Sequence, residues 1–319
     1  MIRCLIAAAG LVACLAHAQT YPTKPVKIIS PTGPGLSTDL VARMLAEKLS
    51  RSMGQQFFVE NLPGAATIVG AQAAAKAAPD GYTLLMATAG TVVNNPLVYK
   101  TLPYDPEKDF AYIAFVGDSS SFMIVVTPDL PARSIAELVA MEKKQPKSLS
   151  YAIEVSSGVA AMIGRYLNKV AGTEMVEVPY KASAQAVQDT ITGRTQVHIS
   201  TWGSMEQFIR AGKLRILAST AEKRLPNLPE VPVVAETYPG FVLTGFFMLA
   251  APAATPVPVL QRLNRETVAA ASEPDFGKRL GSFGMYTNKL GSREETLETL
   301  KTEKARWTRI VKELGIEPQ

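Results

Sequence analysis

The chain has 319 residues, of which 47% are hydrophobic and 19% are charged, and its formal net charge is +5. A chain of this size can bury a large core and is more readily organised as two lobes than as one. The basic excess is weak and is not gathered into a stripe of Lys and Arg, which excludes a nucleic-acid-binding surface. It would only favour encounters with small anionic solutes.

The first 18 residues have the composition of a secretory signal peptide. Arg3 supplies the positive charge, residues 5–15 form an apolar run, and residues 16–18 (Ala-His-Ala) are a small-residue cleavage site. We expect cleavage after Ala18 and export to the periplasm of a Gram-negative bacterium. A loose lipobox that ends at Cys14 keeps lipidation of that residue as the alternative. No other run approaches transmembrane length, so we expect the mature protein to be soluble.

The residues needed for catalysis are scarce. Both cysteines, Cys4 and Cys14, lie in the signal, so the mature chain has no disulfide and no thiolate. A serine hydrolase needs a general base, only His198 remains to serve as one, and there is no Gly-x-Ser-x-Gly motif. Metal-ligand clusters and phosphate-loop or dinucleotide glycine patterns are also missing. We therefore expect no enzyme, no metal and no cofactor, and interpret His198 as a core or edge residue.

Residues 30–39 (Ser-Pro-Thr-Gly-Pro-Gly-Leu-Ser-Thr-Asp) are the first candidate binding segment. They follow a strand pattern at 26–30 and lead into an amphipathic helix pattern at 37–53. Ser37 is the expected N-cap, and free N–H groups at a helix start, with hydroxyls beside them, form an anion site. No Lys or Arg lies in this turn, so dipoles would hold the anion. The alternative is an ordinary strand-to-helix turn.

The same order of strand, small-residue turn and helix occurs three times before residue 100. The second unit has a strand at 56–60 and a helix at 65–78, and the third has a strand at 83–87 and a short helix to about residue 99. Ligands of open α/β sheets bind outside the carboxyl ends of the strands. The turns at 31–38, 64–67 and 88–91 should therefore open onto one edge.

The pattern of alternating strands and helices continues to the end of the chain and indicates two α/β lobes. We expect further strands at 110–117, 122–127, 148–152, 174–178, 196–200, 214–219 and 241–250. We expect further helices at 134–144, 159–171, 184–192, 202–211, 256–271, 274–283 and 292–314. Two such lobes with small-residue turns facing inwards are typical of a periplasmic binding protein that closes on a small solute.

Short motifs along the whole mature chain carry a family resemblance. They are Tyr-Pro-Thr-Lys-Pro-Val-Lys (21–27), Gly-Leu-Ser-Thr-Asp-Leu-Val-Ala-Arg (35–43), Val-Glu-Asn-Leu-Pro-Gly (59–64), Ala-Pro-Asp-Gly-Tyr-Thr-Leu-Leu-Met (78–86), Leu-Pro-Tyr-Asp-Pro-Glu-Lys-Asp-Phe (102–110), Val-Pro-Tyr-Lys (178–181), Ala-Gly-Lys-Leu-Arg (211–215) and Leu-Pro-Glu-Val-Pro-Val-Val-Ala-Glu (228–236). Each motif is weak, but their order is specific. Together they resemble the tripartite tricarboxylate transporter substrate-binding family, the TctC-like or Bug receptors.

The resemblance implies an α/β, type II, Venus-flytrap fold with the ligand cleft between two lobes. It implies a signal at 1–18, a first domain at 19–121, an inserted second domain at 122–243 and a return to the first domain at 244–319. The expected partners are a small organic acid or amino-acid-like ligand and integral membrane transporter subunits, and we expect a monomer. The open alternatives are a receptor that signals to a membrane sensor kinase and an orphan receptor for a non-carboxylate solute.

In this family the ligand carboxylate is held by backbone amides and hydroxyls without an ion pair. On the first domain the implied ligand-binding residues are Thr32, Gly33, Gly35, Leu36, Ser37, Thr38, Ala66, Thr67, Thr88, Ala89, Gly90 and Thr91. On the second domain they are Glu154, Ser156, Ser157, Gly158, Val159, Ala182, Ser183, Ser200 and Thr201.

The chain departs from the family pattern in ways that bear on specificity. Leu36 replaces the second glycine of a diglycine, and Ser200 stands where an Asp is frequent. We expect one carboxylate on the first lobe and a distal end that meets a less polar second lobe. Glu154, if it faces the cleft, would repel a second carboxylate and could pair with an amine; the alternative is a surface charge. Trp202 and Phe247 are expected in the core rather than on the cleft wall.

Overall fold

The computed structural model describes residues 21–153, 158–180, 182–282, 284–287 and 289–318. Its first sheet has the strand order β2-β1-β3-β9-β4, in which β2, β1 and β3 are parallel and β9 is antiparallel to both of its neighbours. These strands are β1 (Val26–Ser30), β2 (Phe57–Asn61), β3 (Thr83–Thr88), β4 (Phe110–Val126) and β9 (Thr244–Pro252).

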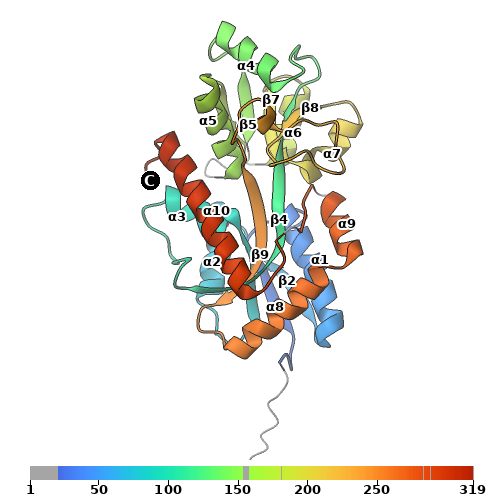
Figure 1. The fold of residues 1–319 in the computed structure, drawn as a ribbon, viewed down its shortest axis with the longest axis vertical. Helices are drawn as coiled ribbons and strands as arrows, with labels where there is room; N and C mark the ends of the chain where they lie inside the picture. Colours follow the sequence, from blue (N-terminus) through green and yellow to red (C-terminus); the bar gives the residue numbers. More distant parts are fainter. Residues whose placement is uncertain (1–20, 154–157, 181, 283, 288, 319) are drawn as a thin grey trace, which may run out of the picture.

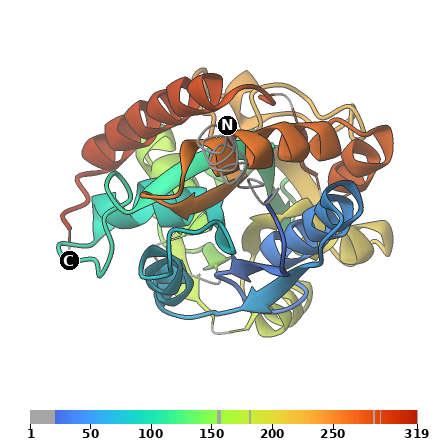
Figure 2. The same cartoon turned by 90° about the horizontal axis from the view of Figure 1, so that it is seen from below.

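Alternation along the strands of the first sheet divides the core between its two faces. Ile28 and Leu84 pack with the helices of one face, whereas their neighbours Ile29 and Leu85 pack with those of the other. The first face carries α1 (Ser37–Met53), α8 (Val257–Ala271) and α9 (Pro274–Ser282), and the second carries α2 (Ile68–Ala75) and α10 (Arg293–Leu314). Figure 2 shows these two groups of helices on opposite sides of the strands.

A second sheet has the order β6-β5-β7-β4-β8 and forms the upper part of the molecule in Figure 1. Its other strands are β5 (Ser150–Ile153), β6 (Val176–Pro179), β7 (Val197–Thr201) and β8 (Arg215–Ser219). The accompanying helices are α4 (Ile135–Lys144), α5 (Val159–Ala171), α6 (Ser183–Ile191) and α7 (Trp202–Arg210). A 3₁₀ turn, Val234–Glu236, lies on the way back to β9.

The prediction of two strands at 110–117 and 122–127 is wrong, because β4 is one strand of 17 residues. It stays paired with β9 from Phe110 to Ser121 through several register shifts and then pairs with β7 from Phe122 onwards. The polar residues in its middle indicated a turn, but bulges absorb them without ending the pairing. The predicted domain boundaries at 121/122 and 243/244 stay a prediction.

The helix after β2 is shorter than predicted, and the short helix after β3 ends close to the predicted residue 99. The first begins with a 3₁₀ turn, Ala65–Thr67, whose residues have positive φ, and α2 ends at Ala75 instead of 78. The second is a π-helical segment, Gly90–Asn94, that continues into α3 (Asn95–Val98). No helix in the described part of the chain has the length and apolar character needed to cross a bilayer.

Gly70 allows α2 to lie directly against the turn that follows β1. A Cβ added at this position would be 2.8 Å from the Cα of Pro31 and 3.0 Å from the carbonyl oxygen of Leu62. Both of these atoms belong to backbone segments that cannot rotate away as a flexible side chain does. The contact therefore fixes the position of the first turn relative to α2.

We expect Gly70→Ala to lower the free energy of unfolding by about 1–3 kcal/mol, because the added methyl group overpacks a backbone contact. Gly277→Ala in α9 is the matched control, since a Cβ there meets nothing within 4 Å. It should raise stability by up to about 1 kcal/mol through helix propensity. Urea denaturation of the two variants measures both effects. Equal effects of the two substitutions would contradict the proposed contact.

Candidate functional site

A cavity of about 420 Å³ lies where the first sheet, the second sheet and the β4–β9 pair meet. We call it the interlobe cavity. The first-sheet side contributes Thr32, Leu36, Ser37, Thr38, Ala66, Thr67, Thr88, Ala89, Gly90 and Asn95. The second-sheet side contributes Gly158, Val159, Ala160, Ser183, Ser200, Thr201 and Ser204, and the β4–β9 pair contributes Phe122, Gly245, Phe246 and Phe247.

Most residues implied by the family resemblance lie in this wall, on both sides. Four residues of the set do not line the cavity: Gly33, Gly35, Thr91 and Ala182. Each of them is next in sequence to a residue that does. Glu154, Ser156 and Ser157 lie outside the described residues. Among the described residues, the assignment of ligand contacts stays a prediction.

Several wall residues are absent from the sequence-based set. Asn95 and Ser204 are polar, but they come a few residues after the predicted turns. The prediction was limited to the turns and therefore missed them. The sequence gives no indication that Phe122 and Phe246 line a cavity, because an apolar residue on a predicted strand is assigned to the core. Phe247 was expected in the core, and it is both 7% exposed and part of the wall. Trp202 is buried and is not in the wall, as expected for a core residue.

Five helices begin at this cavity: α1, α2, α5, α6 and α7. Among the described residues, none of them has a side-chain hydrogen bond to cap its first turn. By contrast α4 and α10 begin away from the cavity, and serine side chains cap both. The first N–H groups of a helix have no partner inside it, and the helix dipole adds partial positive charge there. Such starts bind anions well.

The predicted N-cap role of Ser37 is wrong. Leu36 occupies the cap position, with φ −76° and ψ 158°, and Ser37 is the first helical residue. The turn is closed by another side chain, because the Asp39 carboxylate accepts a hydrogen bond of 2.9 Å from the Gly35 N–H. Gly35 has a φ of +81°, which a residue with a side chain adopts only with strain. The Ser37 hydroxyl is therefore not used as a cap.

Asp39 holds the first turn through a buried network. Its carboxylate, 2% exposed, also accepts hydrogen bonds from Arg43 at 3.1 Å and from the Asn61 side chain at 2.9 Å. Asn61 in turn donates to the carbonyl oxygen of Thr32 at 3.0 Å. Burial alone would raise the pKa of Asp39, but the hydrogen bonds from Arg43, Gly35 and Asn61 outweigh it and lower the pKa below 3.8. The charge of Arg43 is thereby engaged by Asp39.

The second turn is held in a strained conformation. Ala65, Ala66 and Thr67 have φ values of 44°, 52° and 76°, in the left-handed region that disfavours residues with a side chain. The Asn95 side chain donates to the carbonyl oxygen of Ala66 at 2.9 Å, and the Thr67 and Thr91 hydroxyls lie 3.0 Å apart. These bonds hold Ala66 and Thr67 in the cavity wall.

A tyrosine supports the third turn from behind. The Tyr104 hydroxyl donates to the carbonyl oxygen of Thr91 at 2.7 Å. Burial raises the pKa of Tyr104 to about 12, so the hydroxyl stays protonated and available as a donor at neutral pH. The π-helical segment that follows Thr88 is thus tied to the protein on the side away from the cavity.

The described wall of the interlobe cavity contains no charged side chain. Its polar groups are hydroxyls, one amide and backbone, and its apolar surface comes mainly from Phe122, Phe246 and Phe247. The first-sheet side contributes six polar side chains and the second-sheet side four hydroxyl residues, and the expectation of a less polar second lobe stays a prediction. The described residues also contain no group of three His, Cys, Asp or Glu side chains that could hold a metal ion.

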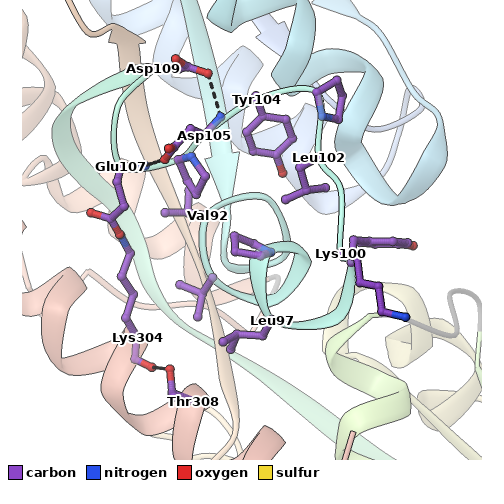
Figure 3. Close-up of a pocket in the computed structure, with 15 residues that line it drawn as sticks. Val92, Leu97, Lys100, Leu102, Tyr104, Asp105, Glu107, Asp109, Lys304 and Thr308 are labelled. Atoms are coloured by element: carbon purple, nitrogen blue, oxygen red, sulfur yellow. Dashed lines mark hydrogen bonds and ion pairs between the residues drawn. The ribbon is translucent and has the colours of Figure 1, made fainter. Parts of the chain in front are cut away.

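A larger cavity of about 690 Å³ lies on the far side of the π-helical segment, between α3 and α10 (Figure 3). Its charged residues other than Lys100 are already engaged within the protein. Lys304 pairs with Glu107, and the Asp109 carboxylate accepts a hydrogen bond of 2.7 Å from the Asp105 N–H. Most of its charged groups are thus satisfied without a ligand, so we take the interlobe cavity as the candidate site.

Two sheets joined through β4, with a cavity that collects helix starts and has no charged side chain in its described wall, define a solute-binding protein. A family model described as tripartite tricarboxylate transporter family receptor matches residues 41–316. BugT of Bordetella pertussis is 32% identical over 317 residues, which cover 99% of this chain and 96% of BugT. The chain belongs to this receptor family, the TctC or Bug family. It is a family of periplasmic binding proteins rather than of enzymes.

Solved structures support the same fold. The structure of R. palustris Rpa4515 with adipate has a TM-score of 0.87 and 31% identity, and the match covers 94% of this chain and 100% of that chain. The structure of MatC from Rhodopseudomonas palustris with bound malate has a TM-score of 0.81 and 26% identity, covering 91% of this chain and 100% of that chain.

We expect Asp39→Asn to lower the free energy of unfolding by about 1–2 kcal/mol at pH 7, because it weakens charge-assisted hydrogen bonds that close the first turn. The lowered pKa in the folded state means that the ionised carboxylate stabilises the fold above about pH 4, and that this contribution is lost as the pH falls further. The difference between the two proteins should therefore shrink below pH 4. Denaturation from pH 7 to 3 measures it, with the exposed Glu298→Gln as control; a constant difference would refute the role of the charge.

We expect Ala66→Gly to raise the free energy of unfolding by up to about 1 kcal/mol, because glycine adopts the left-handed conformation without strain. Ala305→Gly on the exposed face of α10 is the control and should cost about 1 kcal/mol. Thermal denaturation of both variants gives the comparison. A loss of stability at both positions would show that the turn at 65–67 stores no strain.

Proposed function

We propose that this protein binds a small carboxylate in the interlobe cavity and delivers it to the membrane subunits of a tripartite transporter. The observation that carries the proposal is the convergence of five helix starts, none capped by a described side chain, on one cavity whose described wall has no charged side chain. Partial positive charge from backbone N–H groups and hydroxyl donors suits a carboxylate.

The dimensions and the apolar surface of the cavity narrow the ligand class. A volume of about 420 Å³ accommodates a small organic acid. The three phenylalanines offer a surface for methylene groups between the carboxylate and the distal end, and hydroxyls occur on both sides of the cavity. Binding of adipate by Rpa4515 and of malate by MatC supports a ligand with carboxylates at its ends.

The family description supports delivery to a transporter. The proposal places the protein in the periplasm after removal of residues 1–18, which lie outside the described part of the chain. Uptake of the bound acid should then depend on this protein and on the integral subunits together. Loss of uptake in a strain that lacks the receptor tests this step.

The binding step is tested by isothermal titration calorimetry of the mature protein with adipate, malate and adipamide. We expect at least one of the two acids to bind and the uncharged adipamide not to bind, because the helix starts attract negative charge. Ser37→Ala and Thr38→Val should each weaken acid binding by about tenfold, the effect of losing one hydrogen bond to a charged group.

Ser272→Ala is the matched control, because Ser272 is exposed at the end of α8, away from the cavity. It should leave the affinity unchanged. Tighter binding of adipamide than of adipate would refute the carboxylate proposal while leaving the receptor fold intact. An acid that binds with full affinity to both cavity variants would place its carboxylate elsewhere.

A further inference from the structure

A second cavity of about 420 Å³ adjoins the β4–β9 pair on the side away from the interlobe cavity. We call it the rear cavity. Ser121 lines the rear cavity, and the next residue, Phe122, lines the interlobe cavity. Consecutive residues of a strand point to opposite faces, so the two cavities lie on opposite sides of β4 at this point. Ser121 lies in the second half of β4.

Two hydroxyl residues form the floor of the rear cavity. Ser121 and Thr244 are directly opposite each other in the antiparallel pair, and both line the cavity. Ser121 is fully buried, and its hydroxyl has no hydrogen-bond partner among the residues that the structure describes. A buried hydroxyl without a partner costs free energy that a bound acceptor would recover.

Four cationic side chains surround this floor. Lys223 and Arg224 come from the loop after β8, whereas Lys289 and Arg306 come from the segment that leads into α10 and from α10 itself. Glu222 is the acidic residue in the wall. The cavity therefore receives positive charge from two segments that are far apart in the chain.

The nearby carboxylates do not balance these cations. Arg224 pairs with Glu236 at 2.8 Å. Lys289 and Arg306 share one carboxylate, Glu303, at 3.0 and 3.4 Å, and Glu303 is 3% exposed. Lys223 has no ion pair within the described chain. Counting Glu222, four cations meet three carboxylates, which leaves one excess positive charge beside the floor hydroxyls.

We propose that the rear cavity binds a small multivalent oxyanion, with phosphate or polycarboxylate oxygens. Phosphate and carboxylate oxygens accept hydrogen bonds from hydroxyl groups and from Lys and Arg side chains, and the rear cavity has all of these donors. The ligand would satisfy the Ser121 hydroxyl and the excess charge together. Since the wall comes from both the 221–226 loop and the 286–306 segment, a bound oxyanion would also bridge the two behind the interlobe cavity.

The test is isothermal titration calorimetry of the mature protein with inorganic phosphate and with citrate, at an ionic strength fixed with sodium chloride. We expect saturable binding of at least one probe with a Kd of about 10 mM or tighter, weakened by added salt. Binding of phosphate alone would indicate a phosphate ligand, and binding of citrate alone a polycarboxylate. Lys223→Gln and Arg306→Gln should each weaken binding by about tenfold.

Ser121→Ala should also weaken binding while leaving the melting temperature unchanged or higher, because it removes a buried hydroxyl that has no described partner. Lys213→Gln, at an exposed position outside the cavity, is the matched control and should bind like the parent protein. Absence of saturable binding by both probes would overturn the proposal. An unchanged affinity in Lys223→Gln would also overturn it. Binding that is lost in Thr38→Val and kept in Lys223→Gln would assign the anion to the interlobe cavity.

Discussion

The antiparallel pairing of β4 with β9 is the constraint on which the rest of the structure depends. β4 is the one strand shared by both sheets, and its 17 residues pair with β9 along the first sheet and with β7 and β8 in the second. The orientation of the second sheet relative to the first is therefore set by the path of this strand. Its pairing with β9 contains several register shifts, and bulges of this kind increase the local twist and bend of a strand. The phenylalanines of the interlobe cavity come from the same pair.

The helices that begin at the interlobe cavity lack a stabilising interaction at their first turn. A side-chain cap typically stabilises a helix by about 0.5–2 kcal/mol, and no described side chain caps any of the five helices that begin at the cavity. Away from the cavity, serine side chains cap α4 and α10, whereas α8 begins at Pro256 without a side-chain cap. The left-handed residues at 65–67 add backbone strain in the same wall. Uncapped helix starts and backbone strain are thus concentrated at this cavity, which is the pattern expected of a site built to receive a ligand.

Neutral donors also suit a receptor that must release its ligand. A Lys or Arg in the cavity would have to lose its hydration when a carboxylate bound, and the resulting buried pair would resist separation. Backbone N–H groups are fixed in direction by their helices and carry only partial charge. They recognise a carboxylate without leaving a full charge behind when it departs. The Asp39 network serves this arrangement, because it engages Arg43 outside the cavity while closing the first turn.

The local part of this site was predictable from the sequence, and the long-range part was not. Glycine and proline at 31–35, followed by Ser37 and Thr38, correctly indicated the first turn, and strand periodicity placed the second and third turns at the same edge. The cap was assigned to Ser37 because a serine before a helix is the common solution; the competing bond from Gly35 to Asp39 depends on a positive φ that the sequence does not show. Phe122 and Asn95 reach the cavity only through tertiary packing. The polar residues in the middle of β4 led to the prediction of two strands. The pairing that keeps β4 continuous is with β9, more than 100 residues away in the sequence.

The core limits how the two halves of the molecule can move around a ligand. One continuous apolar cluster contains Leu85 of the first sheet, Ile153 of the second and Trp307 of α10. Separating the sheets would expose this cluster to water, at a cost that grows with the apolar area uncovered. At its far end α10 contacts α5, where the Tyr166 hydroxyl donates a partly buried hydrogen bond of 3.0 Å to Glu313. A small rotation that keeps Trp307 packed and sacrifices this bond is therefore far less costly than separation. A ligand that contacts both sides of the cavity needs only a modest difference in affinity between the two arrangements to shift their populations.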